Sequence, residues 1–106
     1  MQQEKRVLWD ERVRLVPSGF SWVDHRLVRD GYIRRCDPDA LALYLLLVSV
    51  SDANGLSYYS DKSICRLVQL TVERLGSARQ RLITADLVAY EAPIYQVLSI
   101  PEGRQA

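Results

Sequence analysis

The sequence has few of the residues that build disulfide frameworks, metal sites and phosphate-binding loops. It contains two cysteines, Cys36 and Cys65, too few for a disulfide framework, and Cys65 lies on an apolar helix face that favours a reduced core residue. His25 is the only histidine, and no ligand stands at a spacing typical of metal sites. The glycines are isolated, which argues against a glycine-rich phosphate loop. We therefore predict no metal and no cofactor.

Catalytic motifs and long apolar runs are also lacking. No pattern brings His25 next to a serine nucleophile, and Asp37 and Asp39 are explained by helix capping, so we expect that the protein is not an enzyme. The longest apolar run, Ala40 to Val50, is shorter than the roughly 20 residues that a bilayer-spanning helix needs. The chain opens without a signal peptide. These features predict a cytoplasmic protein with no membrane partner.

The apolar content is sufficient for one small hydrophobic core. The chain has 106 residues, 48% of them hydrophobic. We divide it into an N-terminal arm, residues 1–19, and one folded domain, residues 20–106. In the arm, Asp10 can cap a short helix that Pro17 would end, with Val13 and Val16 docking it on the domain.

Two short amphipathic helices meeting at a tight turn are predicted between Ser60 and Ile83. Ser60 and Thr71 are each placed to accept hydrogen bonds from the free N–H groups at the start of a helix. The apolar positions fall on one face of each helix: Ile64, Cys65 and Val68 in the first, and Leu75, Ala78 and Leu82 in the second.

Regular elements are also predicted on both sides of these helices. Asp37 as cap and Pro38 at the first position start a helix that should run to about Val50. A turn at residues 52–55 leads into a short strand at 56–59, and two further strands, 87–90 and 94–100, form a hairpin whose turn, residues 91–93, carries no basic side chain.

This order of elements resembles the bacterial winged helix-turn-helix DNA-binding domains of replication-associated or mobile-element type. The likeness rests on the two capped helices, on an Ala85-Asp86-Leu87-Val88 signal after them, and on an aromatic entry segment ending in Leu27-Val28-Arg29-Asp30-Gly31. It implies an α+β fold with a three-helix core, a β-hairpin wing and an N-terminal extension. The family often has glycine where Gln69 and Asp86 stand, and a non-glycine residue in that left-handed backbone costs roughly 1 kcal/mol.

Positive charge is concentrated on the two helices. Residues 62–81 carry five basic side chains against one acidic, whereas the remainder carries nine basic and twelve acidic. The resemblance implies that helix 71–84 lies in the major groove of double-stranded DNA, in a small transcriptional regulator or a replication accessory factor. The predicted DNA-binding residues are Lys62, Arg66, Thr71, Glu73, Arg74, Ser77, Arg79, Gln80 and Arg81.

Two questions stay open at this point. The arginines could form an ordinary solvated helix face, and Glu73 with the uncharged wing tip fits a protein-interaction or assembly module without sequence-specific DNA binding. In addition, the helix over residues 40–50 is apolar on every face and needs a cover on its outer side. Either Trp9, Phe20 and Trp22 of the same chain supply that cover, or a second copy does, which would make a homodimer.

Overall fold

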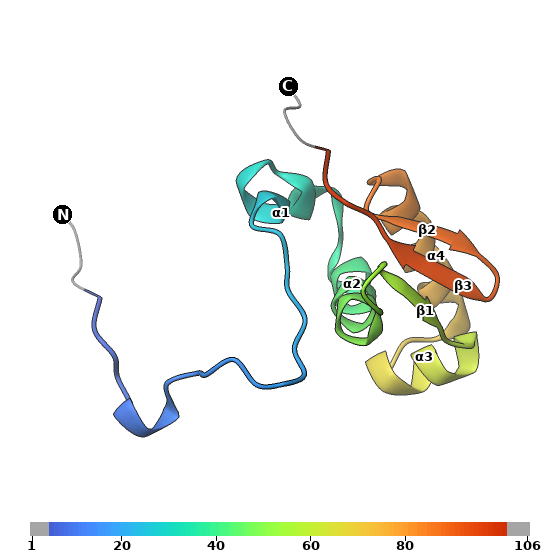
Figure 1. Ribbon diagram of the computed structural model, residues 1–106. Helices are drawn as coiled ribbons and strands as arrows, with labels where there is room; N and C mark the ends of the chain where they lie inside the picture. Colours follow the sequence, from blue (N-terminus) through green and yellow to red (C-terminus); the bar gives the residue numbers. More distant parts are fainter. Residues whose placement is uncertain (1–4, 102–106) are drawn as a thin grey trace.

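The computed structural model describes residues 5–101. Within this part of the chain, four α-helices and a three-stranded antiparallel sheet make an α+β domain, with a long N-terminal segment beside it (Figure 1). The helices are α1 (Arg26–Arg29), α2 (Pro38–Val50), α3 (Asp61–Val68) and α4 (Val72–Thr84), and the strands are β1 (Leu56–Tyr58), β2 (Val88–Glu91) and β3 (Ile94–Val97). Two short 3-10 helices, η1 (Asp10–Arg12) and η2 (Tyr32–Arg35), complete the list.

The sheet has the order β1-β3-β2, so the first strand pairs with the last one. In this register Ser57 lies opposite Tyr95, and Tyr90 lies opposite Tyr95 on the other side of β3. The entry into β1 requires glycine, because Gly55 has φ +82° and an added Cβ would come within 2.6 Å of the Val97 carbonyl oxygen. The order α2-β1-α3-α4-β2-β3 is compatible with a winged-helix fold.

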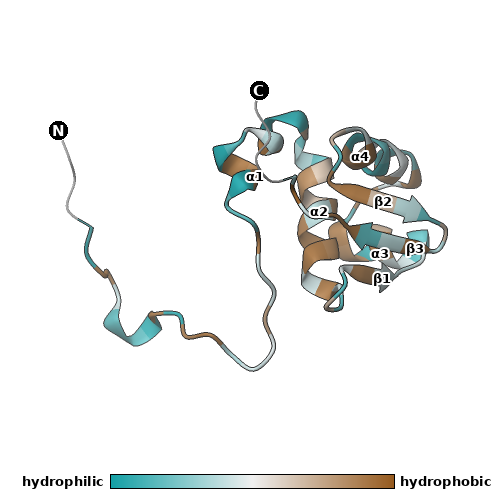
Figure 2. Cartoon of the chain, turned by 45° about the horizontal axis from the view of Figure 1, so that its top comes forward, coloured by the Kyte–Doolittle hydropathy of each residue, from teal (hydrophilic) through white to brown (hydrophobic). Residues whose placement is uncertain are grey.

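Helix α2 starts and ends as its sequence predicts. The Asp37 carboxylate accepts a hydrogen bond from the backbone N–H of Ala40 at 2.9 Å, and Pro38 occupies the first helical position. The core lies between α2, α3, α4 and one face of the sheet (Figure 2). Its largest fully buried side chains are Tyr95, Leu43, Leu47, Ile64, Leu75, Leu82, Leu87 and Val88.

Of the two possible covers for α2, the one from the same chain does not form within residues 5–101. Leu45 is 64% exposed on the outer side of the helix, and Trp9, Phe20 and Trp22 are all largely exposed as well. Phe20 and Trp22 approach α2 only at the edge of a groove, so they do not cover its outer face.

The predicted N-terminal helix is also wrong in its extent and its cap. Only the single 3-10 turn η1 forms, Trp9 rather than Asp10 stands at its cap position, and no side chain caps it. Because so short a helix has little stability without tertiary contacts, the chain returns to extended backbone at Val13, well before Pro17. Val13 and Val16 are exposed and do not dock on the domain.

The last strand is shorter than predicted. Strand β3 ends at Val97, whose N–H donates to the Gly55 carbonyl just before β1, and the next N–H, that of Leu98, donates to the Leu87 carbonyl. Ile100 then turns into the core, where it is buried.

Candidate nucleic-acid interface

Helices α3 and α4 are joined by a turn that both the caps and the backbone specify. The Ser60 hydroxyl accepts a hydrogen bond from the Ser63 N–H at 3.1 Å, and the Thr71 hydroxyl accepts one from the Arg74 N–H at 3.1 Å. Between the helices Gln69 adopts the left-handed conformation with φ 59°, and Leu70 donates back to the Cys65 carbonyl. Both predicted caps are therefore confirmed.

Helix α4 buries one face and exposes the other along its whole length. Leu75, Ala78 and Leu82 are fully buried against α2 and α3. At helical spacing the opposite side carries short or polar side chains, which are Glu73, Gly76, Ser77, Gln80 and Thr84. None of these is basic, so the outermost stripe of α4 has a net charge of −1.

Two of the predicted DNA-binding arginines pair with carboxylates at the start of α2. The Arg74 guanidinium holds Asp39 at 2.7 Å, and this hydrogen bonding lowers the pKa of the Asp39 carboxyl. Arg81 lies 3.8 Å from Asp37, the capping residue of α2. The positive charge on this flank of α4 is therefore neutralised by α2.

Arg79 connects α4 with α3 and the hairpin. One terminal guanidinium nitrogen donates to Asp61 at 3.0 Å and to the Tyr95 hydroxyl at 2.7 Å, and the guanidinium lies 4.4 Å from the centre of the Tyr90 ring. The side chain is only 18% exposed. Burial raises the pKa of the Tyr95 hydroxyl, against the opposing effect of the Arg79 hydrogen bond. Arg79 thus occupies a structural position between three elements.

The other predicted site residues lie on the surface. Lys62 and Arg66 on α3 are exposed, and neither forms a hydrogen bond or ion pair with any residue in the range 5–101. The remaining exposed members are Thr71, Glu73, Ser77 and Gln80, and the Gln80 amide donates to the Thr84 hydroxyl at 3.4 Å. The structure therefore brings the unpaired basic side chains together on α3 rather than on α4.

The sequence alone does not identify the groups that bind these arginines. Asp39 and Asp61 stand 35 and 18 residues before the arginines that they bind, so no local spacing points to either pair. The sequence predicts strands at Tyr90 and Tyr95. It does not predict the contact of their rings, whose centres lie 4.5 Å apart, because that contact depends on the hairpin register.

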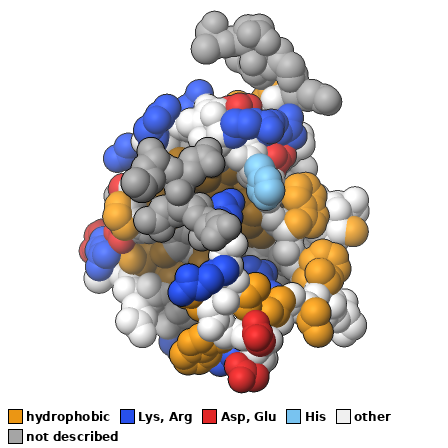
Figure 3. All heavy atoms as spheres, turned by 90° about the vertical axis from the view of Figure 1, so that its left-hand side faces the viewer, with side chains coloured by type: hydrophobic (Ala, Val, Ile, Leu, Met, Phe, Trp, Pro, Cys, Tyr) orange, Lys and Arg blue, Asp and Glu red, His pale blue; other side chains and the backbone are white. Residues whose placement is uncertain are grey.

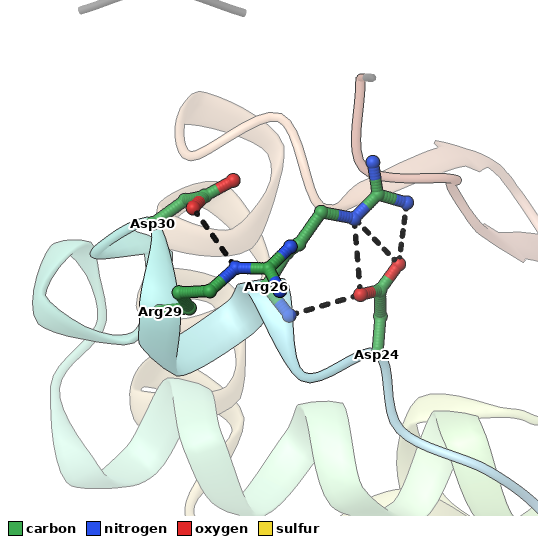
Figure 4. A network of polar contacts seen from close by, with 4 residues as sticks. All are labelled: Asp24, Arg26, Arg29 and Asp30. Carbon is green, nitrogen blue, oxygen red and sulfur yellow. Dashed lines mark hydrogen bonds and ion pairs between the residues drawn. The ribbon is translucent and has the colours of Figure 1, made fainter. Parts of the chain in front are cut away.

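A second polar network lies at the start of α1 (Figure 4). The Asp24 carboxylate accepts from the backbone N–H of Arg26 at 2.9 Å and from its guanidinium at 2.7 Å. These bonds, the side-chain one first, lower the pKa of Asp24 from 3.8 to about 2. Arg29 lies 3.6 Å from Asp30 on the same short helix.

The described residues contain no cluster of three or more histidine, cysteine, aspartate or glutamate side chains that could hold a metal ion. None of the helices over residues 5–101 is long and apolar enough to cross a membrane. Comparison with protein-family models, with curated proteins and with solved structures finds no match to this chain.

Proposed function

We propose that this chain is a non-enzymatic, double-stranded DNA-binding protein with winged helix-turn-helix architecture, in which α4 enters the major groove. The observation that carries the proposal is the outer face of α4, which is exposed over the full helix and is built from short or polar side chains. B-DNA's major groove admits an α-helix, and small residues such as Gly76 and Ser77 allow its backbone to come close to the bases. A role in transcription or in replication of a mobile element fits this architecture.

The proposed DNA contacts follow from which side chains have no ion-pair partner within the described chain. Lys62 and Arg66 on α3 are available for phosphates, because no described residue neutralises them. Glu73, Ser77 and Gln80 face outward and are the groups that could reach base edges. Arg74 and Arg81 would first have to leave their carboxylate partners, and Arg79 would have to leave a partly buried site.

The alternative is a protein-interaction or assembly module of the same architecture. It is favoured by the stripe on α4, which carries one carboxylate and no base, and by two apolar side chains next to the helix-turn-helix turn. Leu67 and Val72 are 57% and 66% exposed. An exposed apolar pair at this position fits a protein surface at least as well as a phosphate backbone.

The discriminating experiment is a titration of random-sequence duplex DNA at two salt concentrations. We expect the parent protein to bind with an affinity that falls with salt, and a variant with Lys62→Glu and Arg66→Glu to lose that binding. The matched control carries Arg29→Glu and Arg34→Glu, two exposed residues outside the helix-turn-helix and outside the N-terminal segment that give the same change in net charge.

Retained binding in the control together with loss in the α3 variant would support the proposal. Equal loss in both variants would mean that net charge alone governs binding. If the parent fails to bind duplex at low salt, the DNA-binding function is excluded and the protein-interaction module stands.

We also propose that two copies act together, because paired winged-helix domains can read two half-sites of one duplex.

A further inference from the structure

The N-terminal arm reaches beyond the predicted residue 19, and its described part, residues 5–23, exposes an unusual amount of apolar surface. All of its residues are exposed, and Figure 1 shows its first half running away from the domain. Soluble monomers rarely leave a large group of hydrophobic side chains open to water. The large hydrophobic side chains of the arm are Val7, Leu8, Trp9, Val13, Leu15, Val16, Phe20, Trp22 and Val23.

An apolar strip lies on one side of α2, where the arm joins the domain. Leu41, Leu45 and Val48 share this side of the helix at positions i, i+4 and i+7, and no charged residue occurs between Ala40 and Val50. Leu45, in the middle of the strip, is as exposed as the aromatic residues of the arm, whereas Leu41 is half-buried and Val48 is buried. The strip is therefore neutral and apolar, and Leu45 is its exposed part.

A groove of about 530 Å³ runs beside the strip. Its lining includes Phe20 and Trp22 of the arm and Tyr44 and Val48 of α2. The Ser21 hydroxyl donates to the Ser49 carbonyl oxygen at 3.4 Å and so fixes the root of the arm beside α2. Figure 3 shows the molecule with the left-hand side of Figure 1 facing the viewer. Hydrophobic side chains, in orange, project along the right edge of this view.

We propose that two copies of this chain exchange their arms, residues 7–16 of each copy lying along the Leu41-Leu45-Val48 strip and the groove of the other. This inference specifies the homodimer proposed above and is independent of DNA binding. It accounts for an exposed apolar arm and an exposed Leu45 in the same chain, neither of which residues 5–101 cover. Exchange of a terminal segment between identical chains is a common route to a symmetric dimer.

The dimensions fit this arrangement. Residues 7–16, three of them in η1, span roughly 29 Å at about 3.3 Å per extended and about 2.0 Å per 3-10 residue. The 13 residues of α2 measure about 20 Å, so one arm can follow the whole helix. A buried aromatic side chain removes about 150–250 Å² from water. Trp9, Phe20 and Trp22 of two copies would together bury on the order of 1,000 Å², and the aliphatic residues bring the total into the range of roughly 1,200–2,000 Å² typical of stable interfaces.

Electrostatics do not oppose the contact. Residues 7–16 carry Asp10 and Glu11 next to Arg12 and Arg14, so the segment has no net charge. The strip has no charged side chain, so no charge of the strip is desolvated when the arm lies on it, while the groove beside it carries Asp24, Arg26 and Asp52.

The test is the mass of the full-length chain in sedimentation experiments without DNA. We expect the parent to sediment at twice its 12.2 kDa chain mass at micromolar concentration. Trp9→Ser in the arm and Leu45→Gln in the strip should each raise the dissociation constant by at least about tenfold. The matched control is Leu67→Gln, a similarly exposed leucine on α3, which should leave the dimer unchanged.

Mixing the two defective variants gives the sharpest result. The Leu45→Gln chain keeps an intact arm and the Trp9→Ser chain keeps an intact strip, so the mixture can form one complete exchange contact and should recover dimer that neither variant forms alone. Circular dichroism checks that both variants remain folded.

A monomeric parent at all concentrations would overturn the proposal. So would a Leu45→Gln variant that stays dimeric while Trp9→Ser dissociates, because the arms would then contact each other instead of α2. Equal dissociation by Leu67→Gln would also overturn it, since the contact would then involve the helix-turn-helix surface.

Discussion

The guanidinium of Arg74 in α4 donates two hydrogen bonds to the carboxylate of Asp39 in α2, Nε to Oδ2 at 2.9 Å and Nη2 to Oδ1 at 2.7 Å. The residue whose position on α4 suggests a base reader is therefore held by a competing acceptor of the same chain. More than half of the Arg74 side chain remains exposed. Because exposed ion pairs contribute only about 0–1 kcal/mol, a phosphate or a base could displace Asp39 at small cost.

Replacing Asp39 with asparagine should therefore strengthen DNA binding. The change frees the Arg74 charge, so we expect a higher affinity for duplex DNA and a salt dependence steeper by about one unit, with little change in stability. Fluorescence anisotropy over a series of salt concentrations measures both parameters. Asp30→Asn, which removes a similar carboxylate beside Arg29, is the control. An equal gain from both variants would trace the effect to net charge and not to Arg74.

Arg79 should matter for stability more than any other basic residue of α4. Its two hydrogen bonds and its contact with Tyr90 are lost in Arg79→Ala, which leaves Asp61 and the Tyr95 hydroxyl without this donor. We expect the free energy of unfolding in urea to fall by roughly 1.5–3 kcal/mol. Arg81→Ala, whose pair with Asp37 is long and exposed, should cost below about 1 kcal/mol. Equal losses would contradict the structural role assigned to Arg79.

Local signals in the sequence predict where the helices begin, but they do not predict which surface arginines form ion pairs. The caps at Asp37, Ser60 and Thr71 are each determined within a few residues and were predictable, and the left-handed turn at Gln69 was implied by the family resemblance. The state of the arginines depends instead on contacts between elements distant in the chain. Counting charges along residues 62–81 gives five basic side chains, but three of them lie within 4 Å of an aspartate.

The N-terminal arm shows a second limit of prediction from the sequence. Its apolar residues predict burial, and the sequence offers both the own chain and a second copy as the cover for α2. The described part of the single chain does not provide that cover, since Trp9 and Leu45 are both exposed. Burial of such residues depends on a surface outside the local sequence, and hydrophobicity alone does not identify which chain supplies it.

Gly76→Ala separates stability from close approach to DNA. A Cβ added at Gly76 meets no atom within 4 Å, and alanine in a helix interior is favoured over glycine by about 0.5–1 kcal/mol. We therefore expect a more stable protein by thermal unfolding. If α4 enters the major groove, the added methyl group should also weaken DNA binding. Because the methyl group meets no other described part of the chain, such a loss would come from its contact with DNA. Stronger stability with unchanged DNA binding would exclude close approach at Gly76.

Gln69→Gly should stabilise the turn between α3 and α4. Gln69 has φ 59°, a conformation that costs a non-glycine residue roughly 1 kcal/mol, and its side chain is exposed. Part of the gain is offset by the greater freedom of glycine in the unfolded chain, so we expect an increase of about 0.5 kcal/mol in the free energy of unfolding. Asp86→Gly, with φ 67°, should gain less, because aspartate tolerates this backbone better than glutamine. A destabilised Gln69→Gly variant would show that the Gln69 side chain makes a contribution that outweighs the strain.

The Asp24 network should make stability depend on acid pH. Hydrogen bonds from Arg26 hold the pKa of Asp24 at about 2 in the folded protein, against 3.8 for the ordinary value. Between these two values the unfolded chain binds more protons than the folded one, so stability rises with pH. The contribution is fully present above pH 3.8 and is lost progressively as the pH falls towards 2. Asp39, whose pKa is also lowered, contributes in the same direction.

Urea unfolding at neutral pH and at a series of acid pH values measures this dependence. Asp24→Asn removes the titrating group, so its stability curve should be flatter below pH 3.8 than that of the parent, and the two curves should converge as the pH approaches 2. Asp52→Asn serves as the control, since no comparable arginine pair holds its carboxylate, which bonds backbone N–H groups of its own turn. Parallel curves for the parent and Asp24→Asn over this range would show that Arg26 does not hold Asp24 in its charged form in solution.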